Sequence, residues 1–389
     1  MKVYMDRPVF PGKVGLQQRM LPEYRQVFID ALAVACQGGL DLFAGQPLPQ
    51  ENVKPASKLY NARYVPARNY NLFPIDSNLY HCWQSGLLTW LEDWQPDVLV
   101  VEANPRYPST RLAVRWMHAR GRPVVGWGLG APPIDPRRIS APTPLSQLLA
   151  AWQKWERMSF LHSLDGLIAY SQRGAQQYRE LGLRIKDISV APNAVSPRPT
   201  SDVPTTRPPV FDGPGTVLYV GRLQQRKRID NLLRACANLP HHLQPRLWIV
   251  GDGPARAGLE QLAIETYPQA EFFGARHGSE LPPIFFAADL FVLPGTGGLA
   301  VQQAMTYALP VIVAEGDGTQ ADLVRPENGF LVPAQDLPAL TAALKAALSD
   351  PAKLREMGAK SYRIVYEEIN VEAMVSAFVN ALVNVMRRS

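Results

Sequence analysis

The chain has 389 residues, and at roughly 150 residues per domain this length predicts two or three domains. Hydrophobic residues make up 47% and charged residues 19%, an ordinary balance that excludes wholesale disorder. The three cysteines are far apart, which excludes a disulfide scaffold and a cysteine zinc site and indicates a reducing compartment. No uninterrupted apolar run approaches the ~18 residues of a membrane span, and residues 1–5 predict a strand rather than a signal peptide. We therefore expect a cytosolic protein.

Positive charge is concentrated in the first half of the chain. Residues 1–195 contain 22 Lys and Arg against 15 Asp and Glu, whereas residues 196–389 contain 18 against 19. A basic first half suits an anionic partner such as a phosphorylated ligand or a lipid surface, including peripheral contact with the inner face of a membrane. A solvated surface with extra arginine explains the same numbers, and the sequence leaves both readings open. We expect no nucleic-acid partner.

Short apolar runs alternate with helical periodicities through the first half. The run at 97–102 is nearly continuous, which is typical of parallel strands that are covered on both faces. A loop with Gly12 and Gly15 follows the first predicted strand. The predicted strands cover 2–6, 40–44, 97–102, 122–127 and 167–170, and the predicted helices cover about 22–37, 78–94, 108–119 and 146–162.

A proline-rich segment divides the chain. Residues 196–215 contain six prolines, too many for a helix or a central strand, so we expect 196–214 to link a domain at 1–195 to one at 215–370. The apolar stripe of the last helix, 371–389, is expected to pack back on the N-terminal domain. The second half has predicted strands at 216–220, 247–250, 271–273, 290–293 and 311–314, and predicted helices at 229–239, 255–266, 280–287 and 299–307.

Two successive arrays of alternating strands and helices predict an α/β fold of two Rossmann-like, doubly wound parallel-sheet domains. Ligands on such sheets bind beyond the carboxyl ends of the strands, so we expect a site in a cleft that the two domains face.

The strongest local signal is a strand that ends at Gly221 and is followed by Arg222, Lys227 and a helix. Glycine lets the backbone approach a ligand closely, and a helix N-terminus offers free amides and partial positive charge. Basic residues at a helix start are unfavourable for the helix itself, which favours a bound anion. The turn therefore predicts a diphosphate site that needs no metal.

The segments around this turn form a recognisable series. They are Trp-Ile-Val-Gly-Asp-Gly-Pro at 248–254, Phe-Phe-Gly at 272–274, Ala-Asp-Leu-Phe-Val-Leu-Pro at 288–294, Ala-Met-Thr-Tyr-Ala-Leu-Pro at 304–310 and Asn-Gly-Phe-Leu-Val at 328–332. In order and spacing the series resembles the donor domain of GT-B glycosyltransferases, specifically retaining family 4, over about 217–357. The resemblance implies a GT-B fold and a donor domain that binds a nucleotide-diphosphate sugar.

The resemblance also implies roles for individual residues. Arg222 and Lys227 match the pair that holds the diphosphate and stabilises the departing phosphate oxygen, usually the largest catalytic effect of such a site. Gly298 and Leu299 match the glycine turn whose amides open a helix against the phosphates. The other implied donor-side residues are Gly221, Gly251 and, near the nucleotide base, Arg276. Gly12 and Gly15 match the loop that faces the donor from the opposite domain.

The chain departs from the family at the donor sugar. The family's two glutamates, separated by seven residues, align with Gly295 and Gln303. Gln303 can still hydrogen-bond ribose, but Gly295 has no side chain to contribute. The glycine-rich stretch that follows is replaced by residues 315–322. The resemblance thus implies that different groups contact the donor sugar, or that the enzyme is impaired.

Four residues of the first half are candidates for the acceptor side. Glu102 ends a strand and could meet an acceptor hydroxyl as a base or orienting group, while a solvated glutamate would look the same. Arg106 follows it. Arg19 and Arg25 lie in a stretch that resembles bacterial polysaccharide and glycolipid transferases, although solvated helix arginines fit equally well.

The resemblance and the residues together predict a retaining, metal-independent glycosyltransferase without a cofactor. It would move a sugar from a nucleotide-diphosphate sugar to a hydroxyl of a glycan or lipid-linked acceptor in polysaccharide or glycolipid synthesis. Two alternatives stay open: a catalytically degenerate member that acts as a nucleotide- or glycan-binding partner subunit, and a sugar-nucleotide epimerase of the same fold, for which Glu102 is the one acid/base candidate.

Overall fold

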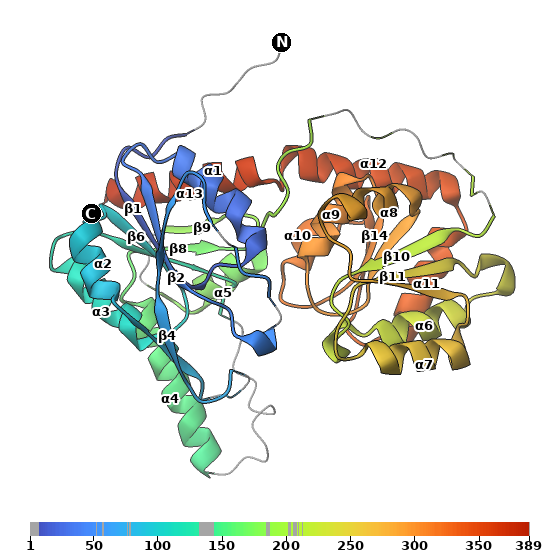
Figure 1. Ribbon diagram of the computed structural model, residues 1–389, viewed down its shortest axis with the longest axis horizontal. Coiled ribbons are helices and arrows are strands. Elements are labelled where there is room, and N and C mark those ends of the chain that lie inside the picture. The colour runs from blue at the N-terminus through green and yellow to red at the C-terminus, as the bar shows by residue number, and fades with distance from the viewer. Residues whose placement is uncertain are drawn as a thin grey trace. The chain divides into compact units, whose positions relative to one another are not determined.

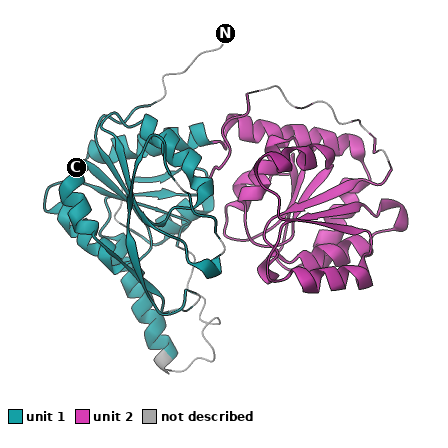
Figure 2. Cartoon of the chain, viewed as in Figure 1, with its two compact units in different colours: residues 1–192, 371–389 teal, residues 193–370 magenta. Residues whose placement is uncertain are grey.

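The computed structural model describes residues 8–388, apart from 52, 57, 76, 78, 132–143, 184–186, 201–203, 205–207, 209 and 212. The strand predicted at 2–6 therefore lies outside the described residues. The chain divides into two compact units (Figure 2), unit 1 with residues 1–192 and 371–389 and unit 2 with residues 193–370. Each unit is built around one parallel sheet.

Unit 1 contains a parallel sheet of seven strands in the order β3-β2-β1-β6-β7-β8-β9 (Figure 1). An antiparallel hairpin, β4-β5, lies outside this sheet. The strands are β1 (Val14–Met20), β2 (Leu40–Gly45), β3 (Arg63–Pro66), β4 (Arg68–Leu72), β5 (His81–Ser85), β6 (Val98–Glu102), β7 (Val124–Gly128), β8 (Gly166–Ala169) and β9 (Asp187–Val190). The helices are α1 (Gln26–Val34), α2 (Leu87–Trp94), α3 (Pro108–His118), α4 (Pro144–Leu161), α5 (Gln172–Glu180) and α13 (Val371–Met386), with 3-10 turns η1 (Glu23–Arg25) and η2 (Pro49–Glu51).

Unit 2 repeats the same strand order, with six parallel strands ordered β12-β11-β10-β13-β14-β15. Helices α6, α7 and α11 cover one face of this sheet, and α8, α9 and α12 cover the other (Figure 1). The strands are β10 (Thr216–Val220), β11 (Arg246–Val250), β12 (Ala270–Gly274), β13 (Leu290–Leu293), β14 (Val311–Ala314) and β15 (Gly329–Val332). The helices are α6 (Ile229–Ala237), α7 (Arg256–Thr266), α8 (Leu281–Ala287), α9 (Leu299–Thr306), α10 (Gln320–Leu323), α11 (Leu337–Leu348) and α12 (Pro351–Glu367), with 3-10 turns η4 (Gln225–Lys227), η5 (His241–Leu243) and η6 (Gly278–Glu280).

In both sheets the first strand lies in the middle and the chain winds outward in both directions, which is the Rossmann order. The fold class predicted from the sequence, two Rossmann-like parallel-sheet units, is therefore confirmed. The central strands of unit 2 are almost fully buried apolar segments, as expected for a sheet with helices on both faces.

Two local predictions for unit 1 are wrong. The predicted loop around Gly15 is strand β1, and the predicted helix at 78–94 contains strand β5 before the shorter helix α2. β1 was missed because it carries buried polar side chains: Gln17 and Arg19 are both buried, and each makes side-chain contacts with other segments of unit 1. The Nε2 of Gln17 donates to Oε1 of Gln84 at 2.8 Å and to Oγ1 of Thr110 at 2.9 Å. A strand whose buried polar groups find partners only in the folded unit has no apolar signature in the sequence.

The C-terminal helix α13 belongs to the core of unit 1. Phe378 packs edge-on against Phe28 of α1 and Trp127 of β7, at ring-centroid separations of 5.0 and 4.9 Å. The stretch Pro351–Met386, which joins α12 and α13, is long and apolar enough to cross a membrane by length and composition, but 56% of its most apolar window is buried in the protein. Its apolar side chains therefore serve packing within the units. The described residues of the proline-rich segment 196–214 form no helix or strand.

Candidate functional site

The carboxyl end of β10 carries the predicted diphosphate turn. Gly221 directly follows the strand, and a Cβ on Gly251 would lie only 1.9 Å from the carbonyl oxygen of Gly221. Gly251 also has a φ of +145°, so only glycine fits this crossing of two backbones. The hydroxyl of Tyr219 donates to the Arg222 carbonyl at 2.9 Å, and burial raises the pKa of Tyr219 so that this donor stays protonated. The buried side chain of Tyr219 therefore holds the turn that carries Arg222 in place.

Lys227 reaches from this turn to the loop that follows β13. Its ammonium donates to the Thr296 carbonyl, and Arg226 binds the Thr296 side chain at 3.0 Å. Burial, as the largest cause, and the charges of Arg226 and Arg222 together lower the pKa of Lys227 to about 8, while the charge of Asp317 opposes them. A cluster of cations that lower one another's pKa favours the binding of a negatively charged ligand.

The loop after β13 and the start of α9 complete the cluster. Gly298 caps α9, and Leu299 is its first residue. A Cβ on Gly297 would lie 2.5 Å from Nζ of Lys227, so the backbone before the helix touches the ammonium. The backbone N–H groups of the first turn of α9 therefore lie beside Lys227, and their partial positive charge adds to the charge of the basic side chains. Gln303 is partly exposed one turn further along α9, and its side-chain amide makes no hydrogen bond to the described residues.

Gly295, which the sequence resemblance aligns with a glutamate, has no room for a side chain. A Cβ at this position would lie 2.4 Å from the carbonyl oxygen of Arg226 and 2.5 Å from the carbonyl carbon of Lys227. The loop therefore packs directly on the Arg226–Lys227 turn, and no side chain can project from Gly295 toward a ligand.

Arg276 lies on the loop after β12, two strands away from β10 in the sheet. Its guanidinium forms an exposed ion pair with Glu280 at 2.8 Å, and His277 takes part in the N-terminal cap of η6. Among the described contacts, none joins Arg276 to Arg222 or Lys227.

The acceptor-side candidates of unit 1 lie in different local environments. Glu102 is not a solvated strand end: it accepts a hydrogen bond from the Arg19 backbone N–H at 2.6 Å and another from the Tyr107 hydroxyl, and burial raises its pKa. Arg19 is not on a helix; it is buried in β1 and forms an ion pair with Glu51. Arg106 is partly buried in the loop after β6.

The expected positions of Gly12 and Gly15 are wrong. Both lie at the amino end of β1, the edge of the sheet opposite to the carboxyl ends where ligands bind. A Cβ on Gly12 would collide with Asp97, and one on Gly15 would press on Trp90 and Leu99. These glycines are required for close packing of the sheet.

Sequence reasoning did not reveal that Arg25 is partly buried among aromatic rings. Its guanidinium lies over the rings of Trp127 and Tyr170, at 4.9 and 5.3 Å from their centroids. Nη1 of Arg25 and Nε1 of Trp127 are buried without a hydrogen-bond partner among the described residues. Both lie near the carboxyl ends of β1 and β7, the same edge of the sheet as Glu102.

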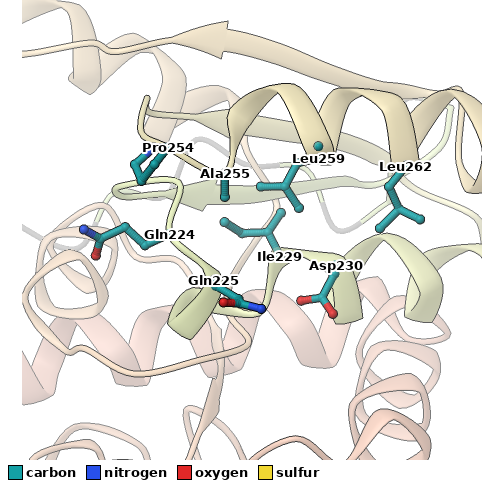
Figure 3. A pocket seen from close by; sticks show the side chains of 9 residues that line it. Gln224, Gln225, Ile229, Asp230, Pro254, Ala255, Leu259 and Leu262 are labelled. Carbon is teal, nitrogen blue, oxygen red and sulfur yellow. The ribbon is translucent and has the colours of Figure 1, made fainter.

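A separate cavity of about 550 Å³ opens between α6 and α7 of unit 2 (Figure 3). Gln224 and Pro254 stand at one end of it, and Leu262 stands at the other. No donor-side residue predicted from the sequence lines this cavity. Across the described residues, no group of three or more His, Cys, Asp or Glu side chains is placed to hold a metal ion.

Comparison with known proteins points to one class. Residues 206–364 match the family model for glycosyl transferases group 1. The chain is 23% identical over 236 residues to the lipopolysaccharide core biosynthesis glycosyltransferase LpsE of Rhizobium meliloti, covering 58% of this chain and 66% of that one. It is 39% identical over 126 residues to a GDP-mannose-dependent alpha-mannosyltransferase of Mycobacterium tuberculosis, covering 31% of each chain.

The chain therefore spans less than two thirds of the length of these curated relatives. Among solved structures, the sucrose-phosphate synthase of Thermosynechococcus elongatus superposes with a TM-score of 0.71 at 19% identity, covering 97% of this chain and all of that one. The fold is thus shared along almost the whole chain, whereas the match to the family model lies within unit 2.

Proposed function

We propose that the protein is a retaining, metal-independent glycosyltransferase that uses a nucleotide-diphosphate sugar as donor. The observation that carries this proposal is the convergence of Arg222, Lys227 and the first turn of α9 at one edge of the unit 2 sheet. The segment that contains them matches the glycosyl transferases group 1 model, which supports the same conclusion.

In this proposal Arg222 and Lys227 bind the two phosphates and stabilise the negative charge that grows on the diphosphate as the sugar leaves. Fixed cations and helix amides are preorganised for that charge and need no metal to act. Gln303, with a free side-chain amide, hydrogen-bonds the ribose, and Arg276 lies on the side of the nucleotide base.

The acceptor is proposed to bind unit 1, whose sequence is the more basic part. Glu102 would orient the attacking hydroxyl, with Arg106 beside it. The acceptor class, a glycan or lipid-linked sugar, is supported by the relative named for lipopolysaccharide core synthesis. A cytoplasmic location is supported by three buried free cysteines. Peripheral contact with the inner face of a membrane is supported by Trp152 and Trp155, which stand exposed on α4 beside Lys154.

Replacing Lys227 by Ala tests the proposal. We expect loss of sugar transfer and of the thermal shift caused by UDP, GDP or ADP, because the variant removes the ammonium that meets the diphosphate. Lys345→Ala, an exposed lysine on α11, is the matched control and should behave like the wild type. Unchanged turnover of Lys227→Ala would refute the assignment.

A second function is favoured by one observation, the backbone that fills the place of the family glutamate at Gly295. A catalytically degenerate partner subunit would keep nucleotide binding without chemistry. Incubation with a panel of nucleotide sugars separates the two, since only an active enzyme releases nucleoside diphosphate.

A further inference from the structure

Asp317 and Thr319 form a small polar unit in the turn after β14. The hydroxyl of Thr319 donates to Oδ1 of Asp317 at 2.6 Å, and the Thr319 N–H donates to the same oxygen at 3.1 Å. Thr319 is 7% exposed, whereas Asp317 is exposed. Oδ2 of Asp317 accepts no hydrogen bond from the described residues, and none of their basic nitrogens lies within ion-pair distance of it. The turn thus holds a carboxylate with one oxygen open to solvent.

This carboxylate lies close to the proposed diphosphate site of unit 2. A Cβ on Gly298 would be 3.2 Å from Oγ1 of Thr319, so the threonine touches the residue that caps α9. The buried amide of Gln320 donates to the Gly297 carbonyl at 2.6 Å and fixes the turn to the loop after β13. Gly297 in turn touches the ammonium of Lys227. A continuous set of contacts therefore connects Asp317 with the cations of the proposed diphosphate site.

A carboxylate is a poor neighbour for a diphosphate, because the two anions repel each other. It is a good acceptor for neutral hydroxyl groups, which the diphosphate lacks and a sugar carries. The family glutamate that would contact the sugar is replaced by Gly295, and the backbone leaves no room for a side chain there. The solvent-exposed oxygen of Asp317 belongs to a carboxylate near the same site, and it is available to bind the sugar in place of the missing glutamate.

We infer that Asp317 binds the donor sugar through its hydroxyl groups, with Thr319 as its positioning residue. The inference rests on the proposed donor function. It also assigns a substrate class: the donor carries a neutral sugar with free hydroxyls near the diphosphate, since a uronic acid would bring a second carboxylate against Asp317.

The test compares each nucleotide with its sugar form, by calorimetry on the full chain with UDP and UDP-glucose and with GDP and GDP-mannose. Asp317→Asn keeps the size of the side chain and an oxygen for Thr319 but removes the charge. Hydrogen bonds to charged groups predict a loss of roughly tenfold to hundredfold in affinity for the nucleotide sugar, with affinity for the free nucleotide unchanged. Thr319→Ala should give a smaller loss of the same kind, and its donor KM should rise more than its kcat falls. Glu315→Gln, an exposed carboxylate two residues before Asp317, is the control and should match the wild type.

Three results would overturn the inference. One is unchanged nucleotide-sugar binding in Asp317→Asn. Another is an equal loss for nucleotide and nucleotide sugar, which would mean that Asp317 acts on the Lys227 region and not on the sugar. The third is a wild-type protein that binds the nucleotide as tightly as its sugar form. A wild-type protein that binds no nucleotide at all would instead remove the proposed function, and the inference with it.

Discussion

Lys227 should destabilise the empty protein, because its charge is partly buried among other cations. The difference between the usual lysine pKa of 10.5 and the value of about 8 corresponds to about 3 kcal/mol at 1.36 kcal/mol for each pH unit. Lys227 is only partly buried, so water screens part of this penalty, and its hydrogen bond to Thr296 returns about 1 kcal/mol. We therefore expect Lys227→Met to be about 1 kcal/mol more stable than the wild type at pH 7.

The pH dependence has a definite sign. Because the folded pKa lies below the unfolded one, the unfolded chain binds more protons between pH 8 and pH 10.5, and the wild type gains stability over this range relative to the variant. Urea unfolding of both proteins at pH 7, 9 and 10.5 measures the difference in stability, which should shrink as the pH rises and then change sign, because the charge penalty is lost while the hydrogen bond to Thr296 can remain. Saturating nucleotide should reverse the order at pH 7, since only the wild type binds it. A variant that is less stable than the wild type at pH 7, or a difference independent of pH, would refute the reasoning.

Two further predictions concern packing. Gly295→Glu introduces the glutamate that the resemblance aligns here, but it should cost about 3 kcal/mol or more in urea unfolding and gain no activity, because its Cβ would collide with the Arg226 carbonyl; a stable, more active variant would show that the loop can move aside. Phe378→Ala should cost about 3–5 kcal/mol, since its ring is fully buried between α1 and β7. Limited proteolysis should then release the C-terminal helix, and an unchanged digestion pattern would contradict its place in the core.

The sequence was most informative where the structure is built from apolar runs. The strands of unit 2 are short, buried and separated by clear turns, so their positions and the turn at Gly221–Lys227 could be predicted within a few residues. Unit 1 was harder, because β1 carries buried polar side chains and β4-β5 form a half-exposed hairpin. Their pairing depends on hydrogen bonds between residues far apart in the sequence, which periodicity cannot detect.

The proposed donor site was also only partly predictable from the sequence. Local spacing was enough to indicate Arg222 and Lys227, because the proposed diphosphate site consists of one turn and one helix start. The exclusion of a side chain at Gly295 and the nearness of Thr319 to Gly298 arise from contacts between loops on three neighbouring strands. A replaced glutamate in an alignment therefore says only that a contact is missing. The structure adds that backbone atoms fill the space beside Gly295 and that the carboxylate of Asp317 belongs to the turn that contacts Gly298, and both observations support our inference that sugar binding is changed and not lost.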